Sequence, residues 1–140
     1  MTISLCIIAF FSDLNTAYKL GSLGIKLEPR SNFTLTKRNA GDFTFYDVGL
    51  GACGETNSDS DFICALSREQ FGSSPGGNSN KNPNCDRMIK ASFGSKTVTV
   101  KVVDLCEGCS ADDLDLSPAA FDELSPASAG RIKGTWEFTS

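Results

Sequence analysis

Alternation of apolar and polar residues between positions 88 and 105 is the clearest pattern in this chain. Small or apolar residues occupy every second position on both sides of Gly94-Ser95: Ile89, Ala91 and Phe93 before it, and Val98, Val100 and Val102 after it. A period of two is typical of strands with one buried face, and a glycine-containing pair between two such runs favours a tight turn. The pattern therefore predicts a β-hairpin over residues 88–105.

Shorter patterns predict the remaining elements. Strands are expected at residues 43–46, 61–66 and 131–138, the last with Ile132, Trp136 and Phe138 on an inward face. Ser67, with Gln70 three residues later, predicts a helical turn, and Ser117 followed by Pro118 predicts the start of a short helix. Residues 49–54 and 72–84 are rich in Gly, Ser and Asn and predict loops, the second ordered chiefly by Cys85 at its end. Many short strands with one or two short helices indicate an all-β fold, a small β-barrel.

The first 40 residues differ in composition and hydrophobic pattern from the rest of the chain. The apolar run from Ile3 to Phe11 is too short to cross a bilayer but fits the central region of a signal peptide, which predicts a signal peptide over residues 1–17 and a secreted protein. A misassigned start with a buried N-terminal segment is the alternative. Residues 18–40 are interpreted as a flexible extension or a pro-segment containing the dibasic pair Lys37-Arg38, and residues 41–140 as the folded domain.

Charge and composition exclude several classes of function. The chain has a net charge of −4, and removing residues 1–38 takes away five of 13 basic and two of 17 acidic residues, leaving −7. A domain this acidic is a poor candidate for binding nucleic acid or an anionic membrane, whereas a neutral polysaccharide carries no such penalty. The absence of histidine excludes Ser-His-Asp and Cys-His catalysis and His-ligated zinc.

The cysteines predict crosslinks rather than redox or metal chemistry. Cys6 lies in the predicted signal peptide, which leaves five. Cys106 and Cys109 are close enough to pair, Cys53 and Cys85 lie in loops, and Cys64 lies in an apolar run. The favoured assignment is Cys53–Cys85, Cys106–Cys109 and a free Cys64, although other pairings stay open. Acidic neighbours disfavour a redox-active Cys106–Cys109, and one such pair is too few for a zinc site, so no metal and no cofactor is expected.

Two aspartates are the candidate chemical groups. Asp47 follows the strand at 43–46, and Asp115 follows the hairpin and its loop at the entry to the second helix. Each could instead stabilise a turn or a helix start, but Ser117 already suits the N-cap position, which favours a site role for Asp115. Asp112 and Asp113 are interpreted as solvated loop charges, and Asp104 as a buried, hydrogen-bonded group.

Two aromatic residues are candidates for contact with a sugar ring. Tyr46 and Trp136 could each present a ring face to a polysaccharide, and packing in the core is the alternative for both.

Four ordered motifs resemble a known family. TFYDVGLGACG (44–54), NPNC (82–85), VTVKVVDLCEGC (98–109) and DLDLSPAAFDEL (113–124) resemble the double-psi β-barrel proteins of the expansin, barwin and rare-lipoprotein-A group, and most of all the small fungal expansin-like proteins that include loosenins. The resemblance implies a six-stranded double-psi β-barrel with one or two short helices and an open polysaccharide-binding groove.

The same resemblance implies roles for the candidate residues. The aspartate of the expansin His-Phe-Asp motif falls on Asp115, with Leu114 in place of the preceding Phe, and a second acid of related endoglucanases is similar to Tyr46-Asp47. Expansins loosen walls without hydrolysis and carry a second carbohydrate-binding domain, which is not expected here because the chain ends at Ser140.

The function expected from the sequence is therefore that of a secreted, monomeric, non-enzymatic protein that binds cell-wall polysaccharide, cellulose or chitin, and loosens it. Asp115, Tyr46 and Trp136 are the expected contacts. One alternative is a protease inhibitor or effector that binds a protein through residues 72–84. Another is a weak endoglucanase or lytic enzyme that uses Asp47 and Asp115.

Overall fold

The computed structural model describes residues 36–139. The predicted signal peptide and most of the predicted extension lie outside these residues. The described strands are β1 (Asn39–Phe45), β2 (Ile63–Ser67), β3 (Met88–Phe93), β4 (Lys96–Cys106), β5 (Leu114–Leu116) and β6 (Ile132–Phe138). The α-helices are α1 (Arg68–Phe71) and α2 (Pro118–Leu124), accompanied by short 3₁₀ turns at Pro75–Gly77, Ser79–Lys81 and Ala127–Ala129.

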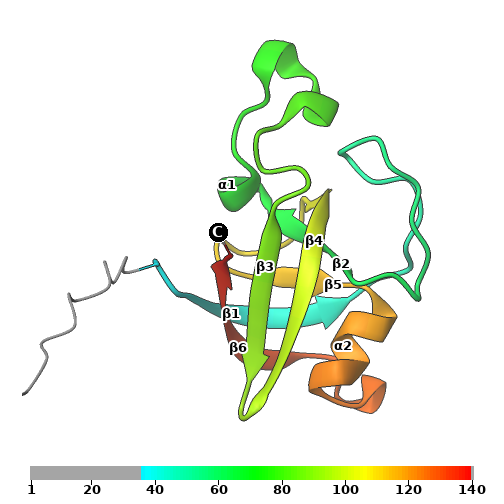
Figure 1. Cartoon of the computed structure of the whole chain (residues 1–140), viewed down its shortest axis with the longest axis vertical. Coiled ribbons are helices and arrows are strands. Elements are labelled where there is room, and N and C mark those ends of the chain that lie inside the picture. The colour runs from blue at the N-terminus through cyan, green and yellow to red at the C-terminus, as the bar shows by residue number, and fades with distance from the viewer. Residues whose placement is uncertain (1–35, 140) are drawn as a thin grey trace, which may run out of the picture. The chain divides into compact units, whose positions relative to one another are not determined.

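The strands close into a mixed barrel in the order β1-β5-β2-β4-β3-β6 (Figure 1). Two strand pairs are parallel, β1 with β5 and β2 with β4, and the other four are antiparallel. Closure leaves no unpaired edge strand, which small β-proteins otherwise have to protect. The prediction of a six-stranded barrel with two short helices is confirmed.

Inward-facing residues of all six strands, together with α2, form one core. Among the largest fully buried side chains are Trp136, Phe43 and Phe121. The predicted hairpin is present, and Gly94 supplies the positive φ of 58° that its tight turn requires. Both helices begin as predicted, because the hydroxyls of Ser67 and Ser117 accept hydrogen bonds from the N–H groups of Gln70 and Ala120.

Two parts of the barrel differ from the sequence expectation. Strand β1 begins at Asn39, two residues before the expected domain boundary. Asp115 does not follow a strand but lies in the middle of one, β5, between β1 and β2. A strand of three residues is too short for alternation to reveal it, and both of its partners are distant in sequence, so only the closed barrel defines it.

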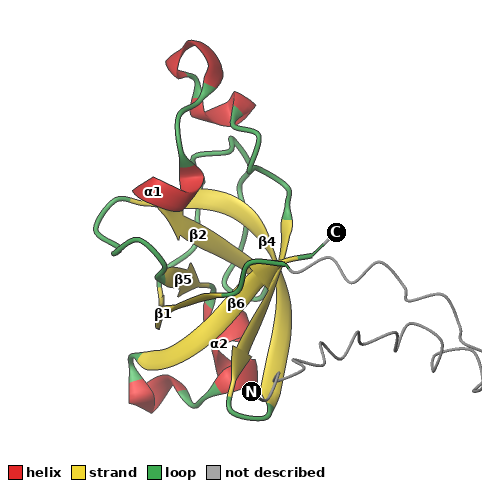
Figure 2. Cartoon of the chain, turned by 90° about the vertical axis from the view of Figure 1, so that its left-hand side faces the viewer, coloured by secondary structure: helices red, strands yellow, loops and turns green. Residues whose placement is uncertain are grey.

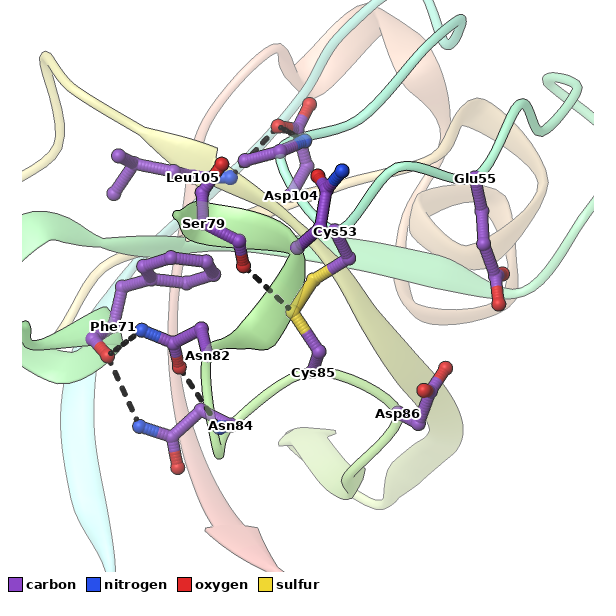
Figure 3. The surroundings of a disulfide bond; sticks show 12 residues. Cys53, Glu55, Phe71, Ser79, Asn82, Asn84, Cys85, Asp86, Asp104 and Leu105 are labelled. Carbon is purple, nitrogen blue, oxygen red and sulfur yellow. Dashed lines mark hydrogen bonds between the residues drawn. A yellow bond between two sulfur atoms is a disulfide. The ribbon is translucent and has the colours of Figure 1, made fainter. Parts of the chain in front are cut away.

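The long loops are anchored at several points (Figure 3). The disulfide Cys53–Cys85 joins the loop after β1 to the loop before β3. The side chain of Asn82 is 4% exposed; its Nδ2 donates to the Phe71 carbonyl and its Oδ1 accepts from the Asn84 N–H. Residues 72–84 are therefore ordered by the buried Asn82 amide as well as by Cys85, contrary to the expectation of an anchor at the end alone.

Within the described residues, no helix is long and apolar enough to cross a membrane.

Candidate functional site

Asp115 is a half-buried acid held on the barrel wall. Its neighbours on β5, Leu114 and Leu116, are fully buried, so the alternation of the strand turns Asp115 to the other face. One carboxylate oxygen accepts a 2.7 Å hydrogen bond from the Thr44 hydroxyl on the neighbouring strand β1. Burial raises the pKa of Asp115, and the Thr44 hydrogen bond opposes part of that rise.

Asp115 does not stabilise the helix that follows it. The N-cap of α2 is Ser117, whose hydroxyl also donates a 2.5 Å hydrogen bond to the Asp61 carbonyl. The alternative interpretation of Asp115 as a helix-start residue therefore has no structural support.

Tyr46 and Asp104 belong to the same cluster as Asp115. Tyr46 directly follows β1 and continues its pairing, since its N–H donates to the Leu116 carbonyl at 3.1 Å. Burial raises the pKa of the Tyr46 phenol, and the charges of Asp104 and Asp115 raise it further, so the hydroxyl stays protonated as a donor. The charge of Asp104 also adds to the raised pKa of Asp115.

Asp104 fixes a loop against the site. Its Oδ1 accepts hydrogen bonds of 2.8 Å from the N–H groups of Ala52 and Leu105, so the group is hydrogen-bonded as expected, but it is half-buried rather than buried. The loop passes so close to β4 that a Cβ at Gly51 would lie 2.3 Å from the Val103 carbonyl oxygen. Glycine at position 51 is therefore required for the loop to reach Asp104.

The second disulfide lies directly beside the candidate acid. Cys106 and Cys109 are bonded, and their sulfurs and a carboxylate oxygen of Asp115 all lie within 4.8 Å of one another. Bonded sulfurs cannot serve as thiolate ligands, so this cluster is a crosslink beside an acid rather than a metal site. With Cys53–Cys85, and Cys64 free and buried, the described cysteines have the pairing that the sequence favoured.

Asp47 and Trp136 differ in solvent exposure from the half-buried residues of the cluster. Asp47 is exposed, and the N–H of the next residue, Val48, donates to Asp59 instead. Trp136 is 1% exposed and its indole N–H donates to the Asp112 carbonyl at 2.8 Å, so it offers no ring face to a ligand and the core alternative holds for it.

The two acids before β5 are structural rather than simply solvated. Asp112 accepts a 2.7 Å hydrogen bond from the Gln70 amide, and Asp113 accepts from the N–H groups of Asp42 and Ser110. Both are half-buried. Sequence reasoning missed the bonds to Gln70 and Asp42 because these partners are distant in the chain, whereas Ser110 lies only three residues before Asp113.

Thr44 is the contact residue that sequence reasoning missed. It lies two residues before Tyr46, and residues two apart on a strand share a face. That spacing was the available signal, but the pairing of β1 with β5 was needed to identify Asp115 as its partner.

The cluster can recognise a hydroxylated ligand. Asp115 can accept hydrogen bonds when ionised and donate one when protonated, while the Tyr46 hydroxyl donates. A carboxyl group with a raised pKa, set beside a phenol in a half-buried position, suits hydrogen bonding to sugar hydroxyls and ether oxygens.

Comparison with known proteins agrees with this architecture. The family model described as "Lytic transglycolase", a double-psi β-barrel, matches residues 75–136. The chain is 32% identical over 111 residues to a papain inhibitor of Streptomyces mobaraensis, covering 77% of this chain and 76% of the inhibitor. The fold and the site thus define a double-psi β-barrel protein. The chain belongs to the same double-psi β-barrel family as this inhibitor.

Other relatives are longer. A homologue of allergen Asp f 7 from Arthroderma benhamiae is 38% identical over 114 residues, covering 70% of this chain but 38% of that protein. The chain therefore spans little more than a third of the length of this relative.

Solved structures show the same fold. The Streptomyces papain inhibitor superposes with a TM-score of 0.68 at 31% identity, covering 74% of this chain and 96% of the inhibitor. A mutant Clavibacter michiganensis expansin in complex with cellohexaose superposes with a TM-score of 0.63 at 24% identity, covering 74% of this chain and 51% of the expansin.

Proposed function

We propose that this chain is a secreted expansin-like protein that binds cell-wall polysaccharide, cellulose or chitin, and loosens it without net hydrolysis. The observation that carries the proposal is the half-buried Asp115, hydrogen-bonded by Thr44 and electrostatically linked to Tyr46. In this proposal Asp115 hydrogen-bonds or protonates a glycan oxygen, and Tyr46 shapes the groove around it. The expansin complex with cellohexaose supports a neutral glycan as the class of ligand.

The arrangement of the acidic residues fits glycan binding better than glycoside hydrolysis. Glycoside hydrolysis needs two carboxyl groups roughly 5–9.5 Å apart, with one free to act as base or nucleophile. Asp104 is the carboxylate whose charge acts on Asp115, but its Oδ1 already accepts two backbone hydrogen bonds. Asp47 remains the candidate second acid in the weaker proposal of a lytic enzyme, but it is exposed and no hydrogen bond from the described residues holds its carboxylate in position.

Secretion is part of the proposal. Two disulfides in a domain of this size are typical of proteins that fold in oxidising compartments. The predicted signal peptide over residues 1–17 lies outside the described residues and is tested separately, by N-terminal sequencing of the exported protein.

Co-sedimentation of the purified domain with cellulose and chitin tests the proposed function. We expect binding to at least one polymer, with no release of reducing ends over many hours. Release of reducing ends that disappears in Asp47→Asn and in Asp115→Asn would replace the loosening proposal with an enzymatic one. Failure to bind either polymer would contradict it outright.

Protease inhibition is the second candidate function. It is favoured by the 31% identity to the Streptomyces papain inhibitor over 96% of that protein. We propose that such binding would use residues 72–84, which project from the barrel between α1 and β3 (Figure 1). Papain assays separate the two candidates, because inhibition through this loop would survive Asp115→Asn and be lost when residues 75–80 are replaced by a short glycine-serine linker.

A further inference from the structure

Basic side chains lie close together on the outer surface of strands β3 and β6. Lys90 on β3 and Lys133 on β6 are exposed, as is Arg38, which directly precedes β1. The chain is acidic overall, with a net charge of −4. A local excess of cations is therefore a property of this face and not of the composition.

A shallow groove of small side chains runs across this face. Paired residues in antiparallel strands point to the same side, so the printed registers align a row across four strands: Ala40, Thr135, Ser92 and Thr97. Two hollows of about 350 and 250 Å³ lie here and share Ser92, Gly94 and Thr135 as lining. We call these two adjoining hollows, which share Ser92, Gly94 and Thr135, the β3–β6 groove.

Charge and hydroxyl groups are arranged along the β3–β6 groove. Lys133 lines one hollow, and Arg38 and Lys90 line the other. Glu137 is the acidic residue in the lining, so three cations and one carboxylate give a net charge of +2. Asp42, beside the groove, is paired with both Lys133 and Arg131, at 2.8 and 3.0 Å, so including Asp42 and Arg131 leaves the local net charge at +2.

Among the described residues, none that lines the groove offers an exposed ring on which a ligand could stack. Trp136 is the aromatic residue in its lining, and it is 1% exposed. Stacking on aromatic rings contributes much of the binding of single-stranded nucleic acid, so that ligand is disfavoured. Affinity at this surface has to come from cations and from the hydroxyls of Ser92, Thr97 and Thr135.

We propose that the β3–β6 groove binds an acidic, uronate-containing polysaccharide. Uronate residues combine carboxylates, which Arg38 and Lys90 would pair with, and hydroxyls, which the Ser and Thr side chains would hydrogen-bond. An acidic peptide offers the charges without the regular hydroxyls. This proposal adds an acidic polymer to the neutral one of the proposed function, and it does not depend on Asp115.

The groove and Asp115 lie on different strands of the barrel. In the closed barrel β5, which carries Asp115, and β3, which carries Lys90 and Ser92, are opposite strands of the six. A neutral chain at Asp115 and an acidic chain centred on β3 in the β3–β6 groove would therefore be held on different walls of one small domain. The protein would bridge two kinds of wall polymer.

Binding to polygalacturonate, with fully methyl-esterified polygalacturonate as the neutral partner, tests the proposal. We expect the wild type to bind the acidic polymer at low salt and to lose most of that binding at ~0.3 M salt. Arg38→Gln combined with Lys90→Gln should weaken binding by about tenfold, as expected for losing two exposed ion pairs. Lys81→Gln, an exposed lysine on the loop at 79–81, is the matched control and should change binding little.

Three results of these measurements would contradict the proposed groove. No binding of the wild type to polygalacturonate, an equal loss in Lys81→Gln, or equal binding to polyglutamate or single-stranded RNA would overturn the proposal. Cellulose and chitin binding is measured on the same variants. Retention of that binding, with no polygalacturonate binding, would reject the groove and leave the proposed function intact, while the reverse pattern would reject the proposed function alone.

Discussion

The half-buried carboxyl group of Asp115 lowers the stability of the folded protein when it is ionised. Its carboxyl group is half-buried and has one hydrogen-bond donor, Thr44, so the ionised form loses more hydration than it regains. Burial therefore raises its pKa above the ordinary value of 3.8. Such a position costs stability when the group is ionised and is retained where a ligand uses the group.

The first prediction concerns this cost. Because the pKa is raised in the folded state, the folded protein holds a proton that the unfolded chain has already lost, and stability falls as the pH rises through that window. Asp115→Asn should remove this loss and raise Tm by a few degrees at pH 7, roughly 1 kcal/mol or less, with a smaller gain at pH 3. Thermal unfolding at the two pH values measures it, with the exposed Asp47→Asn as control. A lower Tm at pH 7 would contradict the assignment.

The second prediction concerns Asn82, whose buried amide holds the loop at 72–84. Its Nδ2 donates to the Phe71 carbonyl and the Ser74 hydroxyl, and its Oδ1 accepts from the Asn84 N–H. Asn82→Ala removes all three hydrogen bonds of this buried amide, although the Phe71 carbonyl keeps the Asn84 amide as a donor, and should cost about 2–3 kcal/mol in chemical denaturation. Asn78→Ala, which removes an exposed hydrogen bond to the Asn80 N–H, should cost much less. Equal costs would mean that the buried amide does not anchor the loop.

At the scale of elements, the two disulfides differ in the length of chain that they close and in their distance from the site. Cys53–Cys85 closes a separation of 32 residues and ties two loops together (Figure 3). Cys106–Cys109 closes a separation of three and lies against Asp115. The first should therefore act mainly on the unfolded chain, and the second mainly on the geometry of the site.

The third prediction follows from this division. Replacing both Cys53 and Cys85 by Ser should lower the free energy of unfolding by ~3–4 kcal/mol, and replacing Cys106 and Cys109 by Ser by ~2 kcal/mol. The second pair should nevertheless weaken polysaccharide binding more than the first. Denaturant unfolding and co-sedimentation of both double variants measure the two effects. If binding followed stability alone, the positioning role of Cys106–Cys109 would be rejected.

At the scale of the whole molecule, closure of the barrel assembles the site. Thr44, Asp104 and Asp115 lie on three different strands, which Figure 2 shows from the side. The loop at 49–54 packs against β4, where its Ala52 N–H donates to Asp104. Parallel pairing of β1 with β5 sets Thr44 beside Asp115. The acidic cluster and the basic groove are therefore products of topology, since each draws on residues distant in sequence.

The sequence predicted local features well because their causes are local. Alternation around Gly94-Ser95 defined the hairpin, and the N-cap positions of Ser67 and Ser117 defined the helix starts. Strand β5 was missed because three residues carry no period and its partners are distant. The basic groove was missed for the same reason, since net charge says nothing about which cations the strand registers bring together.

The central claim is that Asp115 is the group that binds a neutral glycan, and one titration tests it most directly. Binding of cellohexaose and chitohexaose is measured by calorimetry for the wild type, Asp115→Asn and the exposed-site control Asp47→Asn. The account predicts that Asp115→Asn weakens binding by roughly tenfold or more, the loss of one charge-assisted hydrogen bond, while Asp47→Asn leaves it within about twofold. Equal affinities for the wild type and Asp115→Asn, or no binding of either oligosaccharide by the wild type, would contradict it.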